Sequence, residues 1–159
     1  MIDRLMVRIQ TATNATDRLR SARKTIEQVH GQLEGHTDST ATKARKKGKV
    51  MADSLDALLH QIVPKEYKGI RGDSTLVDAR LAKVGFISGR NTQAPTVTER
   101  FALERAEQRL RVTLNRVNGY IAEQWPVYKQ VVEKANPNIL EEYEPLFVDG
   151  SSSSVQRLL

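Results

Sequence analysis

The chain has 159 residues, of which 39% are hydrophobic and 28% charged, with 25 Lys and Arg against 19 Asp and Glu and no cysteine. This hydrophobic content is too high for a wholly disordered chain, and it is too dispersed along the sequence to cross a bilayer. The absence of cysteine excludes a disulfide framework, a thiolate zinc site and a cysteine nucleophile.

The length of the chain predicts a single domain. Residues 2–33 are predicted to form one long amphipathic helix. Their apolar positions recur at intervals of three and four residues, as one face of a helix requires. This stripe consists of Ile2, Leu5, Ile9, Ala12, Leu19, Ala22, Ile26, Val29 and Leu33, with the polar Thr16 on the same side. Gly31 and Gly35 weaken the end of the helix, and residues 34–42 are expected to form a polar connection.

A second helix is predicted from Met51, Leu55, Leu58 and Ile62, which are spaced by four, three and four residues. Pro64 is expected to end it, because proline has no amide hydrogen for the helical ladder. We expect the two helices to pair as an antiparallel hairpin, since this buries both apolar stripes against each other.

A shorter third helix is expected after an irregular link over residues 64–73. Asp73 or Ser74 is the predicted N-terminal cap of this helix, because short polar side chains accept hydrogen bonds from the amides of the first turn. Gly89 is expected to close it. The apolar positions of this segment are Leu76, Ala79, Leu81, Val84 and Ile87.

Another long helix is predicted to start at the strongest local signal in the sequence. Thr96 is followed three residues later by Glu99, and this spacing is that of a capping box, in which each side chain binds the other residue's backbone amide. The apolar stripe that follows consists of Leu103, Ala106, Leu110, Leu114, Val117 and Ile121. The intervening polar residues are expected to face water or partner charges: Arg105, Glu107, Arg109, Arg111 and Arg116.

Pro126 is expected either to kink this helix or to begin a last helix over residues 127–135. Together these segments predict an all-α antiparallel bundle of four to five helices over residues 1–140. The remaining residues, 141–159, contain proline, acidic residues and four serines, and they are expected to form a loosely ordered tail.

The positive charge is concentrated in the first 50 residues, which hold 11 Lys and Arg against 5 Asp and Glu. Its focus is a run of five cations in seven positions: Lys43, Arg45, Lys46, Lys47 and Lys49. Such a run is a candidate contact for polyanions, including nucleic acid and acidic lipid. The simpler interpretation, which we favour, is a solvated connection between helices.

No residue pattern predicts catalysis, a cofactor or a metal site. The three histidines, His30, His36 and His60, lack a ligating neighbour at metal-binding spacing. The nucleophile elbow, the phosphate-binding loop and the dinucleotide-binding motif are all missing from the sequence. Carboxylate pairs such as Glu104 and Glu107 are expected on polar faces, where nothing would desolvate them.

Two further features have a structural and a functional interpretation. Residues 71–73 spell Arg-Gly-Asp, which resembles an integrin-binding loop, but Asp73 is better explained as the helix cap. The aromatic residues are expected to pack in the core and at helix ends rather than to stack on nucleic acid, because the basic run contains none of them. They are Tyr67, Phe86, Phe101, Tyr120, Trp125, Tyr128, Tyr143 and Phe147.

Two stretches carry a family resemblance. Residues 63–70, Val-Pro-Lys-Glu-Tyr-Lys-Gly-Ile, precede a helix, and residues 94–96, Ala-Pro-Thr, begin a long helix that ends in Val117-Asn-Gly-Tyr-Ile-Ala-Glu-Gln-Trp-Pro-Val-Tyr-Lys129. This order resembles the C-terminal helical region of bacterial sortilin-like proteins, large secreted chains that carry BNR (Asp-box) repeat β-propellers of the glycosyl-hydrolase or sialidase-like type. The match covers roughly residues 50–140. The Asp-box pattern S-x-D-x-G-x-x-W is absent, and no active-site residue of the family carries over.

The resemblance implies a non-catalytic C-terminal module with a structural or interaction role. Its partner would be the β-propeller of its own parent chain or another protein, and its location would be periplasmic or extracellular. Without the resemblance, the lack of a targeting segment fits a cytoplasmic protein or a piece of a longer chain. A small basic nucleic-acid-binding protein and a homo-oligomer formed through the first helix are the alternatives, and no membrane span is expected.

Overall fold

The computed structural model describes residues 1–65, 73–89 and 94–135, and within these ranges the chain forms helices and no strand. The predicted all-α bundle is confirmed. Its helices are α1 (Ile2–Gln32), α2 (Ser39–Ile62), α3 (Val77–Ser88) and α4 (Val97–Ala135). The predicted tail over residues 141–159, the end of the predicted domain and the middle of the link over residues 64–73 lie outside the described residues.

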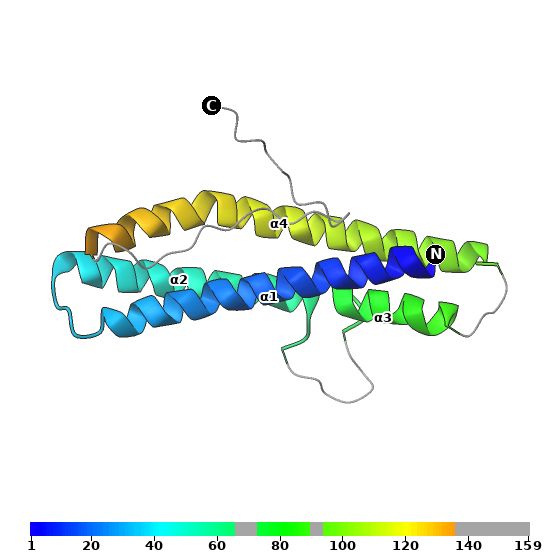
Figure 1. Cartoon of the computed structure of the whole chain (residues 1–159), viewed down its shortest axis with the longest axis horizontal. Coiled ribbons are helices and arrows are strands. Elements are labelled where there is room, and N and C mark those ends of the chain that lie inside the picture. The colour runs from blue at the N-terminus through cyan, green and yellow to red at the C-terminus, as the bar shows by residue number, and fades with distance from the viewer. Residues whose placement is uncertain (66–72, 90–93, 136–159) are drawn as a thin grey trace, which may run out of the picture.

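The bundle is elongated (Figure 1). α1 and α4 run in the same direction along its length, while α2 and α3 follow each other end to end in the opposite direction. α1 and α4 each pack against both α2 and α3. The predicted hairpin of the first two helices is therefore confirmed, and α3 continues the position of α2 in the second half of the bundle.

The core lies along the axis of the bundle, between α1, α4 and the pair formed by α2 and α3. Its largest fully buried apolar side chains are Leu19, Val29, Leu33, Met51, Leu55, Ile62, Val77, Val84, Leu110, Leu114 and Tyr128. The predicted stripes of α1 and α4 largely form this core, but Ile2 and Ile9 are 59% and 36% exposed. They lie three and four residues from Leu5, on the outer edge of α1, where no described helix covers them.

We expected the basic run to form a connection between helices, but the structure places it inside α2. This helix begins at Ser39, and Asp38 caps it by accepting hydrogen bonds from the amides of Thr40 (2.8 Å) and Ala41 (2.9 Å). The buried side of its first half consists of small residues, Ala41, Ala44 and Gly48. Large apolar residues mark a helix in the sequence more clearly than small ones do, and the start of α2 was therefore missed.

Asp73 does not cap the third helix. α3 begins at Val77 with Leu76 at the N-cap and has no side-chain cap. Asp73 Oδ1 instead accepts hydrogen bonds from the amide and the hydroxyl of Thr75, at 2.8 and 2.6 Å, in a turn before the helix. The hydroxyl bond is the main reason why the pKa of Asp73 lies below its ordinary value. The predicted end at Gly89 is confirmed, since its amide donates to Gly85 O.

The capping box at the start of α4 is confirmed. The Thr96 amide donates to Glu99 Oε2 (2.6 Å), and the Glu99 amide donates to Thr96 Oγ1 (3.3 Å). The predicted separate helix over residues 127–135 is wrong, because α4 continues through Pro126 to Ala135. Trp125 and Tyr128 are buried on either side of the exposed proline, and this packing holds the helix together across the missing hydrogen bond.

Candidate interaction surfaces

α1 begins, α3 ends and α4 begins at the same end of the bundle (Figure 1), and these segments carry most of the exposed large apolar side chains. Among the described residues nine large hydrophobic side chains are exposed, and seven of them belong to these segments; the other two are Val50 and Val127. We call this surface the apolar end. It consists of Ile2, Met6, Val7, Ile9, Phe86, Val97 and Phe101. Phe86 and Phe101 lie near helix ends, one of the two positions expected for the aromatic residues, but they are 64% and 57% exposed and do not pack in the core.

Part of the apolar end follows the junction between α1 and α3. Ile2, Met6 and Ile9 are spaced by four and three residues, and they form a second apolar stripe on α1 beside the buried one. α3 packs directly on α1 here, because a Cβ built on Gly85 would lie 3.7 Å from Leu5 Cδ2. The next residue, Phe86, is 64% exposed. Phe86 lies on the outer side of α3, about 100° around that helix from the Gly85 position that faces α1.

The polar side of the same end is held by an ion-pair cluster between α1 and α4. Glu107 is only 7% exposed, which corrects our expectation that it lies on a polar face. Its Oε1 accepts hydrogen bonds from Arg4 Nε (2.7 Å) and Arg8 Nε (2.9 Å). Burial disfavours the charge of Glu107, but the bonds and positive charges of both arginines outweigh it, and the pKa of Glu107 lies below its ordinary value.

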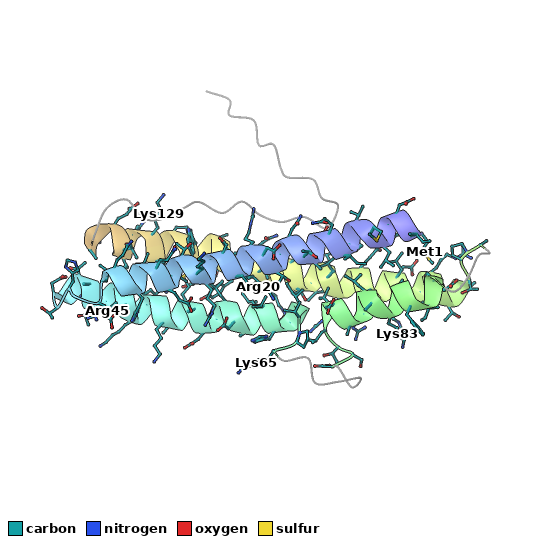
Figure 2. All side chains as sticks on the ribbon, turned by 60° about the horizontal axis from the view of Figure 1, so that its bottom comes forward. Met1, Arg20, Arg45, Lys65, Lys83 and Lys129 are labelled. Carbon is teal, nitrogen blue, oxygen red and sulfur yellow. The ribbon has the colours of Figure 1, made fainter. Side chains whose placement is uncertain are left out.

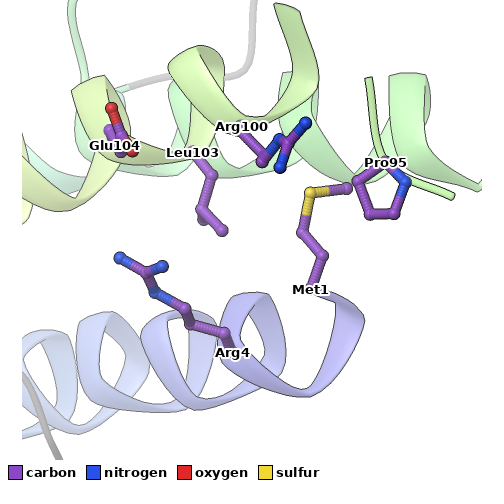
Figure 3. A pocket seen from close by; sticks show the side chains of 6 residues that line it. All are labelled: Met1, Arg4, Pro95, Arg100, Leu103 and Glu104. Carbon is purple, nitrogen blue, oxygen red and sulfur yellow. The ribbon is translucent and has the colours of Figure 1, made fainter. Parts of the chain in front are cut away.

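A small cavity of about 260 Å³ lies beside this cluster. Figure 3 shows Arg4 from α1 and Arg100 and Leu103 from α4 around it, with Met1 and Pro95 at the outer end. The hydrogen bonds of Arg4 are directed to Glu107. Arg4, Arg100 and Glu104 make half of the lining charged, and none of the residues of the apolar end lines the cavity.

The five predicted polyanion contacts do not share one role. Arg45 Nη2 donates to His36 O (3.3 Å), and Lys47 Nζ donates to Gln124 Oε1 of α4 (2.7 Å). Lys43, Lys46 and Lys49 are exposed and lie at successive intervals of three residues on the outer side of α2. We call these three residues the lysine row. The row belongs to the half of the bundle that contains Arg45, which Figure 2 shows far from Met1.

Two of the three histidines lie near the turn between α1 and α2, and the third lies at the other end of α2. His30 lies in the last turn of α1, His36 follows that helix, and His60 lies in the last turn of α2. Within the described ranges no group of three or more His, Asp or Glu is placed to hold a metal ion. Of the Arg-Gly-Asp tripeptide only Asp73 is described, and residues 71–72 lie outside the described part of the chain.

Comparison of the chain with protein-family models, curated proteins and solved structures finds no match. None of the helices in the described residues has the length and hydrophobicity needed to cross a membrane. The chain thus presents an elongated helical bundle with two dissimilar surfaces, the apolar end and the lysine row. The lysine row is part of the basic run that the sequence indicates, whereas the apolar end was not predicted. The spacing of Ile2, Met6 and Ile9 was the signal that would have revealed it.

Proposed function

We propose that this chain is a non-catalytic helical module that binds another protein through its apolar end. The observation that carries this proposal is the gathering of seven exposed large hydrophobic side chains at one end of the bundle. Single exposed apolar residues are normal on a protein surface, whereas their concentration at one end of a bundle favours an interaction surface there. The stripe of Ile2, Met6 and Ile9 has the spacing with which helical surfaces bind an apolar partner.

The apolar end offers enough binding energy for a specific contact. Ile2, Met6 and Phe86 are each more than half exposed, and covering their remaining apolar surface contributes about 1–2 kcal/mol for each side chain. The Arg4–Glu107–Arg8 cluster lies between α1 and α4 and fixes the two helices that carry most of the surface. A fixed surface loses less conformational entropy when it binds than a mobile one does.

The resemblance of residues 63–70 and 117–129 to bacterial sortilin-like proteins suggests the partner. In such a protein the module would follow a β-propeller of the BNR-repeat type in the same chain, and it would pack against it in the periplasm or outside the cell. A partner in the same chain is present at a high effective concentration, and a surface of modest size is then sufficient for stable docking. The role of the module would be structural.

A binding experiment with matched variants tests the surface and the partner. Calorimetry would measure the affinity of the purified chain for the propeller-bearing part of its parent. Met6→Glu with Phe86→Ser is expected to weaken binding by about tenfold or more, as the loss of two buried anchors would. Val50→Glu is the control, because Val50 is 62% exposed but lies on α2, outside the apolar end.

Three results would count against this proposal. Equal affinity of the wild type and the double variant would refute the surface. A parent gene without a propeller would refute the partner. If light scattering shows a dimer, and the double variant Met6→Glu with Phe86→Ser is monomeric, then the partner is a second copy of this chain rather than the propeller.

The non-catalytic part of the proposal has its own assay. The pure chain is expected to release no product from glycoside substrates. Turnover that copurifies with the chain through successive columns would contradict it.

A further inference from the structure

We infer that the lysine row of α2 binds the phosphate backbone of double-stranded nucleic acid. This function goes beyond the proposed protein contact, because it involves neither the residues nor the end of the bundle that carry the apolar surface. It rests on the placement of Lys43, Lys46 and Lys49 on a capped helix.

The helix gives the row a fixed spacing. At about 1.5 Å of rise per residue, Lys43 and Lys49 are about 9 Å apart along the axis of α2, with Lys46 between them. Along about 9 Å of duplex, each strand carries about three phosphates. Positions three residues apart also differ by about 60° around the helix, so the three lysines form a short spiral, and their long side chains can reach neighbouring phosphates.

The row keeps a net positive charge within its own helix, with the exposed Asp53 as the acidic neighbour of Lys49 at a spacing of four residues. No acidic residue occurs between Asp38 and Asp53. Asp38 accepts hydrogen bonds from the first amides of α2, and Asp56 is paired with Arg23 of α1. Lys47 and Arg45 are directed to Gln124 and to the His36 carbonyl, so that the contact surface consists of three lysines rather than the five cations of the run.

Duplex nucleic acid fits this surface better than an acidic membrane or a single strand does. A helix that lies in a membrane surface inserts its apolar side chains, but Met51 and Leu55 of α2 are buried in the bundle. A single strand is held by aromatic stacking as well as by charge, but Trp125 and Tyr128, the aromatic pair packed near α2, are buried too. A purely ionic row is suited to a regular phosphate backbone, and it reads no sequence.

The number of lysines sets the expected salt dependence. Neutralising three phosphates gives a slope of about −2.7 for the logarithm of the binding constant against the logarithm of the salt concentration. A fourfold rise in salt should therefore weaken binding by about 40-fold. A single mobile lysine would give a slope of about −0.9.

Fluorescence anisotropy of a labelled duplex of about twenty base pairs would test the inference, at about 25 and 100 mM salt. The decisive variant carries Lys43→Gln, Lys46→Gln and Lys49→Gln. Its matched control carries Lys65→Gln, Lys83→Gln and Arg111→Gln, which remove the same charge from exposed positions outside the row. Figure 2 shows Lys65 and Lys83 away from Arg45. The wild type and the control should keep the steep slope, while the row variant loses about tenfold or more in affinity at the lower salt.

Three results would overturn the inference. They are no binding of the wild type at the lower salt, an equal loss in both variants, or binding to vesicles of acidic phospholipid without binding to the duplex. Circular dichroism would show that each variant keeps its helices, as expected for exposed positions. If the row variant unfolds, Lys46→Glu alone takes its place, and it should weaken duplex binding more than Lys83→Glu does. The protein contact should be unchanged in the row variant, which separates the two functions.

Discussion

Gly48 provides the sharpest test of the packing between α2 and α4. A Cβ built on Gly48 would lie 3.1 Å from Tyr128 Oη, 3.2 Å from Ile26 Cγ2 and 3.3 Å from Tyr128 Cε2. These contacts are too short for ordinary packing, and both neighbours are buried and have little room to move. Gly48→Ala therefore has two opposing effects, a better helix former and an overpacked core.

Gly119→Ala separates the two effects. Gly119 lies inside α4, and a Cβ built on it meets nothing within 4 Å. Both substitutions gain about 1 kcal/mol of helix propensity, and this contribution cancels in their difference. The difference between the unfolding free energies of the two variants is the overpacking cost alone, about 1–3 kcal/mol.

Urea unfolding followed by circular dichroism would measure both variants against the wild type. Gly119→Ala is expected to raise the unfolding midpoint and Gly48→Ala to lower it or leave it nearly unchanged. Tyr128→Phe removes the nearest atom, and in the Gly48→Ala background it should recover part of the loss relative to Tyr128→Phe alone. Equal stabilisation by both alanines would refute the helix packing described above.

Three further predictions concern single contacts. Folding lowers the pKa of Glu107, so its ion pairs stabilise the protein above the pKa of a glutamate in the unfolded chain, about 4.3, and this stabilisation is lost as the pH falls. Denaturant melts between about pH 6 and pH 3 should therefore show a smaller loss of unfolding free energy for Glu107→Gln than for the wild type. Asp38→Ala removes the cap of α2 and should cost about 1 kcal/mol in urea unfolding, whereas an unchanged midpoint would exclude the cap. Pro126→Ala restores an amide inside α4 and should raise the thermal midpoint, with stabilisation of about 1–3 kcal/mol; a lower midpoint would show that α4 needs its proline.

The sequence predicts elements well where large apolar residues or paired caps mark them. The stripes of α1 and α4 have the helical period over many turns, and Thr96 with Glu99 starts α4 through contacts three residues apart. Both signals are local in the sequence. Pro126 shows the limit of such reasoning, because the burial of Trp125 and Tyr128 offsets the local preference of proline to break a helix.

The parts that could not be predicted depend on contacts distant in the sequence. Glu107 is buried because Arg4 and Arg8 reach it from about a hundred residues away. Ile2 and Ile9 have the spacing of core residues, but they are exposed because α3 covers only one side of α1. The two surfaces follow from this arrangement, since periodicity shows which residues share a helix face but not which faces another helix covers.

Hydroxyl-radical footprinting of the free and the propeller-bound chain tests the apolar end most directly, because it measures the exposure of individual side chains. Met6, Phe86 and Phe101 are exposed in the free chain, and Met51 is a buried internal reference. Binding should lower the oxidation of Met6 and Phe86 and leave Met51 unchanged. Undiminished oxidation of Met6 and Phe86 at saturating partner would contradict the account.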